Sequence, residues 1–323
     1  MKHFTPHALA FGLTLAASTS LAFAQTFPDH PVKVIVPTAP GGSIDTTARA
    51  VAERMQAKWG KPVVIENRPG ASMRLGAEAV QKSPADGYTL LVAHDGTMAI
   101  NPLVFPDLPY DPQKDFVPLG LVVSIPEALM VNQAVPANSV TELIALAKKE
   151  PGQLTHASGG SATLLSLELF KAMAGIDIRS IPYRGGAPAV TGTIGGETSM
   201  IIADLTTGNA GLQSDRMRPL AVTSIERSKK YPNLPTMNEA GVPGYEVNTW
   251  IAFFAPAGTP KEAAAAIETA IKEAVVLPEF RARIEAAGAV VRSGSADELR
   301  KLLAGDVAKW AKLVKDNNIK LAP

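Results

Sequence analysis

Short β-branched runs alternate along this chain with longer amphipathic segments. The first run, residues 32–36, is mostly valine and isoleucine and predicts a buried strand. Prolines and glycines over 37–42 end it, and residues 46–58 then place their apolar side chains on one face, which predicts a helix that Ser43 or Asp45 can cap. A strand that feeds a glycine turn at a helix start exposes backbone N–H groups at the positive end of the helix dipole, where an anion is stabilised.

The same rhythm continues through two further predicted strands, 62–67 and 88–93, with a helix at 76–82 between them. A βαβαβ order implies a parallel sheet with helices on its faces. Ligands of such sheets bind at the carboxyl ends of the strands. Three polar or glycine-rich loops fall there, at 37–45, 68–76 and 94–97.

A second α/β unit follows, with glycine turns of the same design at 159–163 and 183–187. A strand is predicted at 119–123, before the second unit. Within that unit, strands are predicted at 128–131, 154–158, 178–182, 200–203 and 220–223, and helices at 141–149 and 162–174. A strand at 250–255 then returns to the first unit, and helices at 261–276, 279–287 and 297–317 finish the chain. The pattern predicts two lobes, 25–126 with 250–323 and 127–249, that hold a ligand between facing helix N-termini.

Composition narrows the kind of partner. With 46% hydrophobic and 19% charged residues over 323 positions, the chain is typical of a globular protein with two domains. Its 31 Lys and Arg residues nearly balance 30 Asp and Glu residues, which argues against nucleic acid or an anionic membrane. Five scattered histidines and no cysteine give no metal-ligand spacing and no disulfide, so we expect a small ligand and neither a metal nor a cofactor.

Residues 1–24 have the organisation of a secretory signal peptide. A positive start is followed by an apolar segment over 8–21 and by Ala22-Phe23-Ala24, a small-x-small cleavage pattern. A membrane anchor is the alternative, but the apolar segment is short and Ser18, Thr19 and Ser20 interrupt it. A large exported chain without cysteine suits a bacterial periplasm.

Seven motifs, in order along the chain, carry a resemblance to a known family. They are Pro37-x-x-Pro40-Gly41-Gly42-x-x-Asp45, residues 66–71 (ENRPGA), 85–90 (ADGYTL), 182–189 (PYRGGAPA), 220–224 (LAVTS), 239–245 (EAGVPGY) and 255–260 (APAGTP). Together they resemble the Bug family of extracytoplasmic solute receptors of tripartite tricarboxylate transporters. The resemblance implies a type II periplasmic binding-protein fold, α/β in class, without enzymatic activity. It also implies capture of a small carboxylate and delivery to a permease of one large and one small membrane subunit.

The resemblance also implies a site in which backbone groups and ordered water grip the carboxylate. Lobe one contributes the first and third loops, with Thr38, Pro40, Gly41, Gly42, Ser43, Asp45, His94, Asp95 and Thr97. Lobe two contributes two turns and a strand end, with Ser161, Thr163, Tyr183, Arg184, Gly185 and Asp204.

Two departures from the family pattern bear on the ligand. Met73 and Arg74 stand where small residues are usual, and Leu164 stands where histidine is common. Apolar walls with one extra guanidinium favour an aromatic dicarboxylate, such as terephthalate or another phthalate isomer, over an aliphatic di- or tricarboxylate or an amino acid. Arginine matches a carboxylate bidentately, which suits a second carboxylate.

Other roles stay open for several of these residues. Met73 can pack in the core, and Arg74 and Arg184 can be solvated surface residues, while Arg49 is expected to form an ion pair. His94 could act as a base in a periplasmic hydrolase with Ser161, but no nucleophile elbow surrounds that serine. A receptor that also docks on a membrane sensor kinase has the same sequence features. We expect a monomer.

Overall fold

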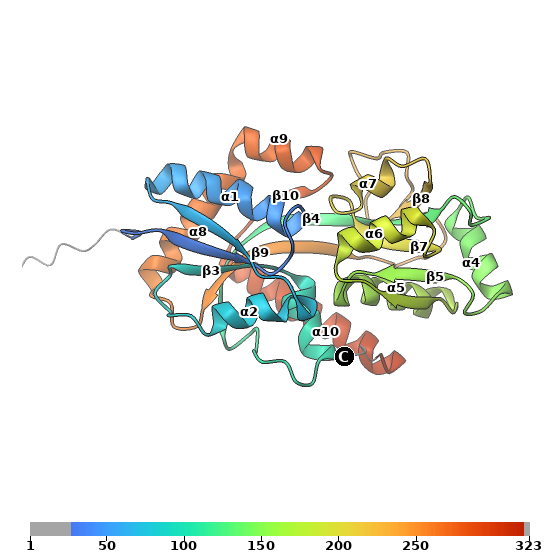
Figure 1. Ribbon diagram of the computed structural model, residues 1–323, viewed down its shortest axis with the longest axis horizontal. Coiled ribbons are helices and arrows are strands. Elements are labelled where there is room, and N and C mark those ends of the chain that lie inside the picture. Colours follow the sequence, from blue (N-terminus) through green and yellow to red (C-terminus); the bar gives the residue numbers. More distant parts are fainter. Residues whose placement is uncertain (1–26, 320–323) are drawn as a thin grey trace, which may run out of the picture.

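The computed structural model describes residues 27–319. The predicted signal peptide, residues 1–24, lies outside the described residues. In the part that is described, no helix has both the length and the apolar character needed to cross a membrane. Figure 1 shows two α/β halves, joined by two long strands that run side by side between them.

Three parallel strands open the first half. Both faces of this sheet are buried, because Leu90 and Val92 belong to the core on one side and Leu91 and Ala93 to the core on the other. Two-sided burial explains why these strands read as nearly continuous apolar runs, and the predicted βαβαβ unit is confirmed. Its elements are β1 (Val32–Val36), α1 (Ser43–Trp59), β2 (Val63–Asn67), α2 (Arg74–Gln81) and β3 (Thr89–His94).

The two connecting strands are β4 (Phe116–Asn132) and β9 (Asn248–Pro256), which pair antiparallel (Figure 1). β9 also pairs with β3 in the first half. Beyond Pro126, β4 leaves β9 and pairs with β7 (Met200–Asp204) and β8 (Met217–Val222) of the second half. One strand therefore belongs to both halves.

The sequence predicted two separate strands in place of β4, and that prediction is wrong. The polar residues that suggested a break, Ser124 and Glu127, stay in the ladder opposite Trp250 and Asp204. Glu127 is buried and its carboxylate is hydrogen-bonded, so the strand continues through it.

The second half packs four helices around its strands. β5 (Thr155–Ser158) pairs in parallel with β6 (Arg179–Pro182) on one side and with β7 on the other. The helices are α4 (Val140–Lys149), α5 (Ser161–Ala174), α6 (Gly186–Gly195) and α7 (Asn209–Leu212).

The C-terminal segment follows β9 and packs against strands of the first half. It forms α8 (Lys261–Val276), α9 (Pro278–Ala286), β10 (Val290–Gly294) and α10 (Ala296–Asn317). The sequence did not predict β10, which pairs antiparallel with β4. Val290 and Arg292 of this strand are exposed, so it lacks the buried run that marks the other strands.

Candidate ligand-binding site

The first loop, residues 37–45, is held in shape by the Asp45 carboxylate. Asp45 accepts hydrogen bonds from the Gly41 N–H (3.0 Å), from Arg49 Nε (3.0 and 3.1 Å) and from Asn67 Nδ2 (2.9 Å). Burial raises the pKa of Asp45, but the bonds from Arg49, Gly41 and Asn67 outweigh burial and hold the pKa below its ordinary value. The ionised Asp45 carboxylate therefore holds the loop in its conformation. Arg49 forms the predicted ion pair, with Asp45 as its partner.

The N-terminus of α1 is left open toward a ligand. The helix begins at Ser43, directly after Gly42, and has no side-chain cap. The predicted capping by Ser43 or Asp45 is wrong, because both residues lie inside the helix. Thr38, in the same loop, has a buried hydroxyl that finds no hydrogen-bond partner within residues 27–319. Unpaired donors of this kind suit an anion or ordered water.

Two turns of lobe two present helix N-termini side by side. α5 follows Gly160 and α6 follows Gly185, both glycines have φ angles in the left-handed region, and neither helix has a side-chain cap. Gly159 fixes their distance, because a Cβ at this position would lie 2.6 Å from the Gly186 N atom. Only glycine permits this approach, which brings the open ends of α5 and α6 together.

Asp204, at the end of β7, connects these turns to lobe one. Its carboxylate accepts hydrogen bonds from the N–H groups of Thr206 and Thr207 at 3.1 and 2.9 Å and from Ser43 Oγ at 3.3 Å. Thr207 also packs against Gly186, at the start of α6. The three uncapped helices α1, α5 and α6 therefore begin around one place between the lobes.

A second connection between the lobes runs through Ser161. Its Oγ donates to Asn101 Oδ1 at 2.7 Å and lies 3.5 Å from the carbonyl oxygen of Gly96. Asn101 is fully buried, and its Nδ2 donates to the carbonyl of Ser72 at 2.8 Å. The lobes thus touch directly, as in a closed two-lobe receptor.

The third loop differs from its prediction. Residues beyond His94 were expected to form a polar loop, but they form a π-helix, η2 (Gly96–Ile100), continued by α3 (Asn101–Val104). His94 Nδ1 accepts the Thr97 N–H at 3.2 Å, and burial lowers the pKa of His94 to about 4. His94 is therefore neutral at neutral pH and fixes this bend of the chain.

The segment before α2 is strained. Ala71, Ser72 and Met73 form η1 (Ala71–Met73), and all three have positive φ angles, which non-glycine residues rarely adopt. Their neighbours hold them there, because Ser72 accepts the bond from Asn101, and Met73 Sδ lies 3.3 Å from Thr97 Oγ1. Met73 also packs against the core, which was its alternative role.

Arg74 has its partners inside lobe one. Its Nε donates to the carbonyl of Ala71 at 3.0 Å, and its Nη1 lies 3.3 Å from Asp107 Oδ1. Its guanidinium carbon stands 4.2 Å from the ring centre of Phe105. The structure thus accounts for Arg74 as a local ion pair and cation–π contact, in contrast to the expected contact with a ligand carboxylate.

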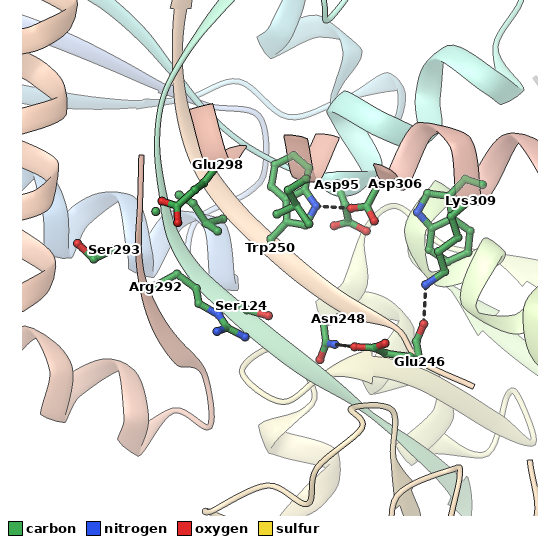
Figure 2. Close-up of a pocket in the computed structure, with 14 residues that line it drawn as sticks. Asp95, Ser124, Glu246, Asn248, Trp250, Arg292, Ser293, Glu298, Asp306 and Lys309 are labelled. Carbon is green, nitrogen blue, oxygen red and sulfur yellow. Dashed lines mark hydrogen bonds between the residues drawn. The ribbon is translucent and has the colours of Figure 1, made fainter. Parts of the chain in front are cut away.

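Asp95 is also separated from the turns. Figure 2 shows its carboxyl group beside Asp306 of α10 and Trp250 of β9, where it lines a cavity of its own. The sequence grouped Asp95 with His94 and Thr97 because they are neighbours in the chain. Asp95 Oδ1 lies 3.9 Å from His94 Nδ1, but its carboxyl group lines the cavity beside α10.

The remaining predicted residues surround the turns. Pro40, Gly41 and Arg184 are exposed, and Leu164 is buried. Tyr183 Oη donates to Glu197 at 2.8 Å, and Thr163 Oγ1 donates to the Gly160 carbonyl at 3.0 Å.

Sequence reasoning missed two residues that hold the site together, Asn67 and Asn101. Asn67 lies within the ENRPGA motif, and Asn101 is an isolated amide in an apolar segment.

Comparisons with known proteins identify the family and the fold. The model of the tripartite tricarboxylate transporter family receptor matches residues 47–319. The solved structure of R. palustris Rpa4515 with adipate is 35% identical, with a TM-score of 0.87, and covers 91% of this chain and 99% of that one. The periplasmic binding protein BugD is 32% identical (TM-score 0.84; 91% and 99% covered), and MatC from Rhodopseudomonas palustris with bound malate is 30% identical (TM-score 0.84; 89% and 100% covered).

Proposed function

Because the chain belongs to the receptor family of tripartite tricarboxylate transporters, we propose that it captures a small dicarboxylate between its two lobes in the periplasm. The closed, loaded receptor, a monomer, then hands the dicarboxylate to a permease of one large and one small membrane subunit. The observation that carries this proposal is the meeting of the three uncapped helix starts, α1, α5 and α6, between the lobes. A sensor kinase that recognises the same closed form is a compatible second partner.

Neutral hydrogen-bond donors bind the carboxylate of the ligand. Arg49, just after the first loop, and Arg68 and Arg74, within the second loop, are already paired with Asp45, Glu66 and Asp107. Open helix N-termini offer backbone N–H groups and the positive end of the helix dipole. Each hydrogen bond to a charged acceptor contributes about 1.5–3 kcal/mol, so three or four of them are enough for micromolar binding.

The ligand class follows from the neighbours and from the walls of the site. Two neighbours were solved with the aliphatic dicarboxylates adipate and malate. The preference for an aromatic dicarboxylate relied partly on Arg74, whose guanidinium is held by Asp107 and Phe105. Met73 and Leu164 still offer apolar surface, so we keep a phthalate isomer as a candidate beside the aliphatic dicarboxylates.

A thermal-shift screen tests this proposal. We expect at least one of adipate, malate, phthalate and terephthalate, at about 100 times its Kd, to raise the melting temperature by about 5 °C. The matching monocarboxylates hexanoate and benzoate should shift it less, because one carboxylate reaches only one set of donors. A chain that none of the dicarboxylates stabilises, or that converts one into a product, would contradict the receptor proposal.

Replacing Ser161 with alanine should weaken dicarboxylate binding by about tenfold or more. In the closed form, the Ser161 hydroxyl satisfies the buried Asn101 amide oxygen, and an unsatisfied buried acceptor costs about 1–3 kcal/mol. Titration calorimetry of Ser161→Ala measures the loss. Thr191→Ala is the control, because its hydroxyl is exposed and bonds only within α6, to Ala187. Equal affinities for the two variants would remove Ser161 from lobe closure.

A further inference from the structure

A second cavity lies beside the strands that join the two lobes. Its volume is about 620 Å³, and its walls come from β4, β9, β10 and α10 (Figure 2). Part of its lining is apolar, with Leu121, Leu302 and the indoles of Trp250 and Trp310. Of the residues predicted to bind the carboxylate, Asp95 alone lines this cavity. It is therefore a different site from the turns around Ser43 and Ser161.

An unsatisfied carboxyl group faces this cavity. Asp95 is 2% exposed, and its Oδ1 atom has no hydrogen-bond partner within residues 27–319. The Asp306 carboxylate lies beside it in Figure 2 and accepts the Trp250 indole N–H at 2.6 Å. Burial raises the pKa of Asp95 well above its ordinary value, and the charges of Asp306 and Glu127 raise it further.

No cation of the described chain satisfies this carboxyl group. Lys309 of α10 donates its ammonium to the carbonyl of Glu246 and stands over the Trp310 ring at 4.7 Å. His94 Nδ1 is 3.9 Å from Asp95 Oδ1, and burial lowers the pKa of His94 to about 4, so its ring is neutral. Figure 2 shows the Arg292 guanidinium beside Ser124, apart from Asp95. The Asp95 end of the cavity thus has negative potential and an acceptor without a donor.

The chemistry of the occupant follows from these walls. The Asp95 oxygen without a donor can accept a hydrogen bond from an N–H group of a ligand. The neighbouring carboxylates of Asp306 and Glu127 favour a ligand with a positive charge. A metal ion fits poorly, because residues 27–319 contain no group of three or more His, Asp or Glu side chains placed to hold one. Leucine side chains and indole rings suit a hydrocarbon chain that carries an ammonium group, and indoles also attract cations.

We propose that this cavity binds a small primary ammonium compound, whose N–H groups donate to Asp95 Oδ1 and whose charge faces Asp306. Its hydrocarbon part lies along the Trp250 and Leu302 side chains. Such a ligand satisfies the buried oxygen and screens the Asp95 carboxylate from Asp306 and Glu127. Burial raises the pKa of Asp95, and a neighbouring ammonium charge acts in the opposite direction, because it favours the ionised carboxylate.

Titration calorimetry with pentylammonium chloride, without any carboxylate ligand, tests the proposal. We expect pentylammonium to bind the wild-type chain at pH 7 and the neutral analogue 1-pentanol to bind at least tenfold more weakly.

Two variants locate the ammonium group. Asp95→Asn should lower pentylammonium affinity at least tenfold, and Asp306→Asn gives a second measure of the same contact. Glu298→Gln is the charge-matched control, since Glu298 lines the exposed rim of the cavity and should change affinity less than twofold.

Three results would overturn the proposal: no heat with millimolar pentylammonium, equal binding of 1-pentanol, or unchanged affinity in both aspartate variants. In the first case, water alone satisfies Asp95. The carboxylate screen of the receptor function uses no amine, so either proposal can fail without the other.

Discussion

Replacing Gly159 with alanine is expected to weaken dicarboxylate binding about 100-fold and to destabilise the fold by about 1–3 kcal/mol. The new Cβ would lie 2.6 Å from the Gly186 N atom and 2.7 Å from the Gly185 carbonyl carbon and the Gly186 Cα. All three atoms are backbone, so no side chain can swing away. The starts of α5 and α6 must separate, and losing two hydrogen bonds to a charged acceptor corresponds to about 3 kcal/mol of binding.

Calorimetry for binding and urea unfolding for stability measure the two effects. Gly195→Ala is the matched control, because the same change, at the last residue of α6, meets no atom within 4 Å. That variant should bind normally and match or slightly exceed wild-type stability. Wild-type affinity in a folded Gly159→Ala protein would show that these two turns do not hold the ligand.

Replacing Glu127 with glutamine is expected to stabilise the protein by about 3 kcal/mol at pH 8, and by about 1 kcal/mol or less at pH 5. Burial, and next the charge of Asp204, raise the pKa of Glu127 to about 7, against the lowering effect of its bonds from Ser166 and Thr249. The ordinary pKa of the unfolded chain is 4.5. Between these two values the folded protein holds a proton that the unfolded chain has lost, so wild-type stability falls as the pH rises from 4.5 to 7. Glutamine does not titrate and escapes this loss.

Glutamine also fits the hydrogen bonds of this position. Thr249 Oγ1 donates to Glu127 Oε1 at 3.2 Å and can donate equally to an amide oxygen. Ser166 Oγ donates to Glu127 Oε2 at 2.7 Å but also lies 3.1 Å from the Ala162 carbonyl. Its hydroxyl hydrogen can turn to that carbonyl and leave the oxygen to accept from the amide, so no polar group is stranded.

Urea unfolding of both proteins at pH 5, 6, 7 and 8 checks the prediction. Burial lowers the pKa of His94 to about 4 and of His156 to about 3, so both histidines destabilise the fold below pH 6.5. They are present in both proteins and cancel in the difference. The same substitution at exposed Glu226 should change stability by no more than about 0.5 kcal/mol. A Glu127→Gln difference that is constant with pH would contradict the prediction.

Local elements were well predicted where burial is uniform. In β1, β3 and β7 nearly every side chain is buried, so each has a short, largely apolar sequence. The amphipathic helices α4, α8 and α10 were predicted to within a few residues at each end. The resemblance to the Bug family and the type II periplasmic binding-protein fold are both confirmed.

Prediction failed where a side chain is satisfied by a distant partner. Glu127 suggested a break in β4 because its hydroxyl donors, Ser166 and Thr249, are remote in sequence. β10 was not predicted, because its half-exposed side chains do not form an apolar run. It is a strand because it pairs with β4. A polar loop was predicted over 94–97, although the chain forms a buried π-helix from Gly96 to Ile100.

By itself, the sequence determined the turns that can seat an anion, because a glycine next to a helix start exposes backbone N–H groups whatever lies around it. Only the tertiary structure decided which side chains join those turns. Arg74 and Asp95 lie in the predicted loops. Arg74, however, pairs with Asp107, and Asp95 lines the cavity beside α10. Asn101, which drew no attention, connects Ser161 to the Ser72 carbonyl. The physical reason is the distance along the sequence over which each interaction is determined. Local φ and ψ angles fix the direction of backbone donors, whereas a side chain bonds to any group that the fold brings within about 3 Å.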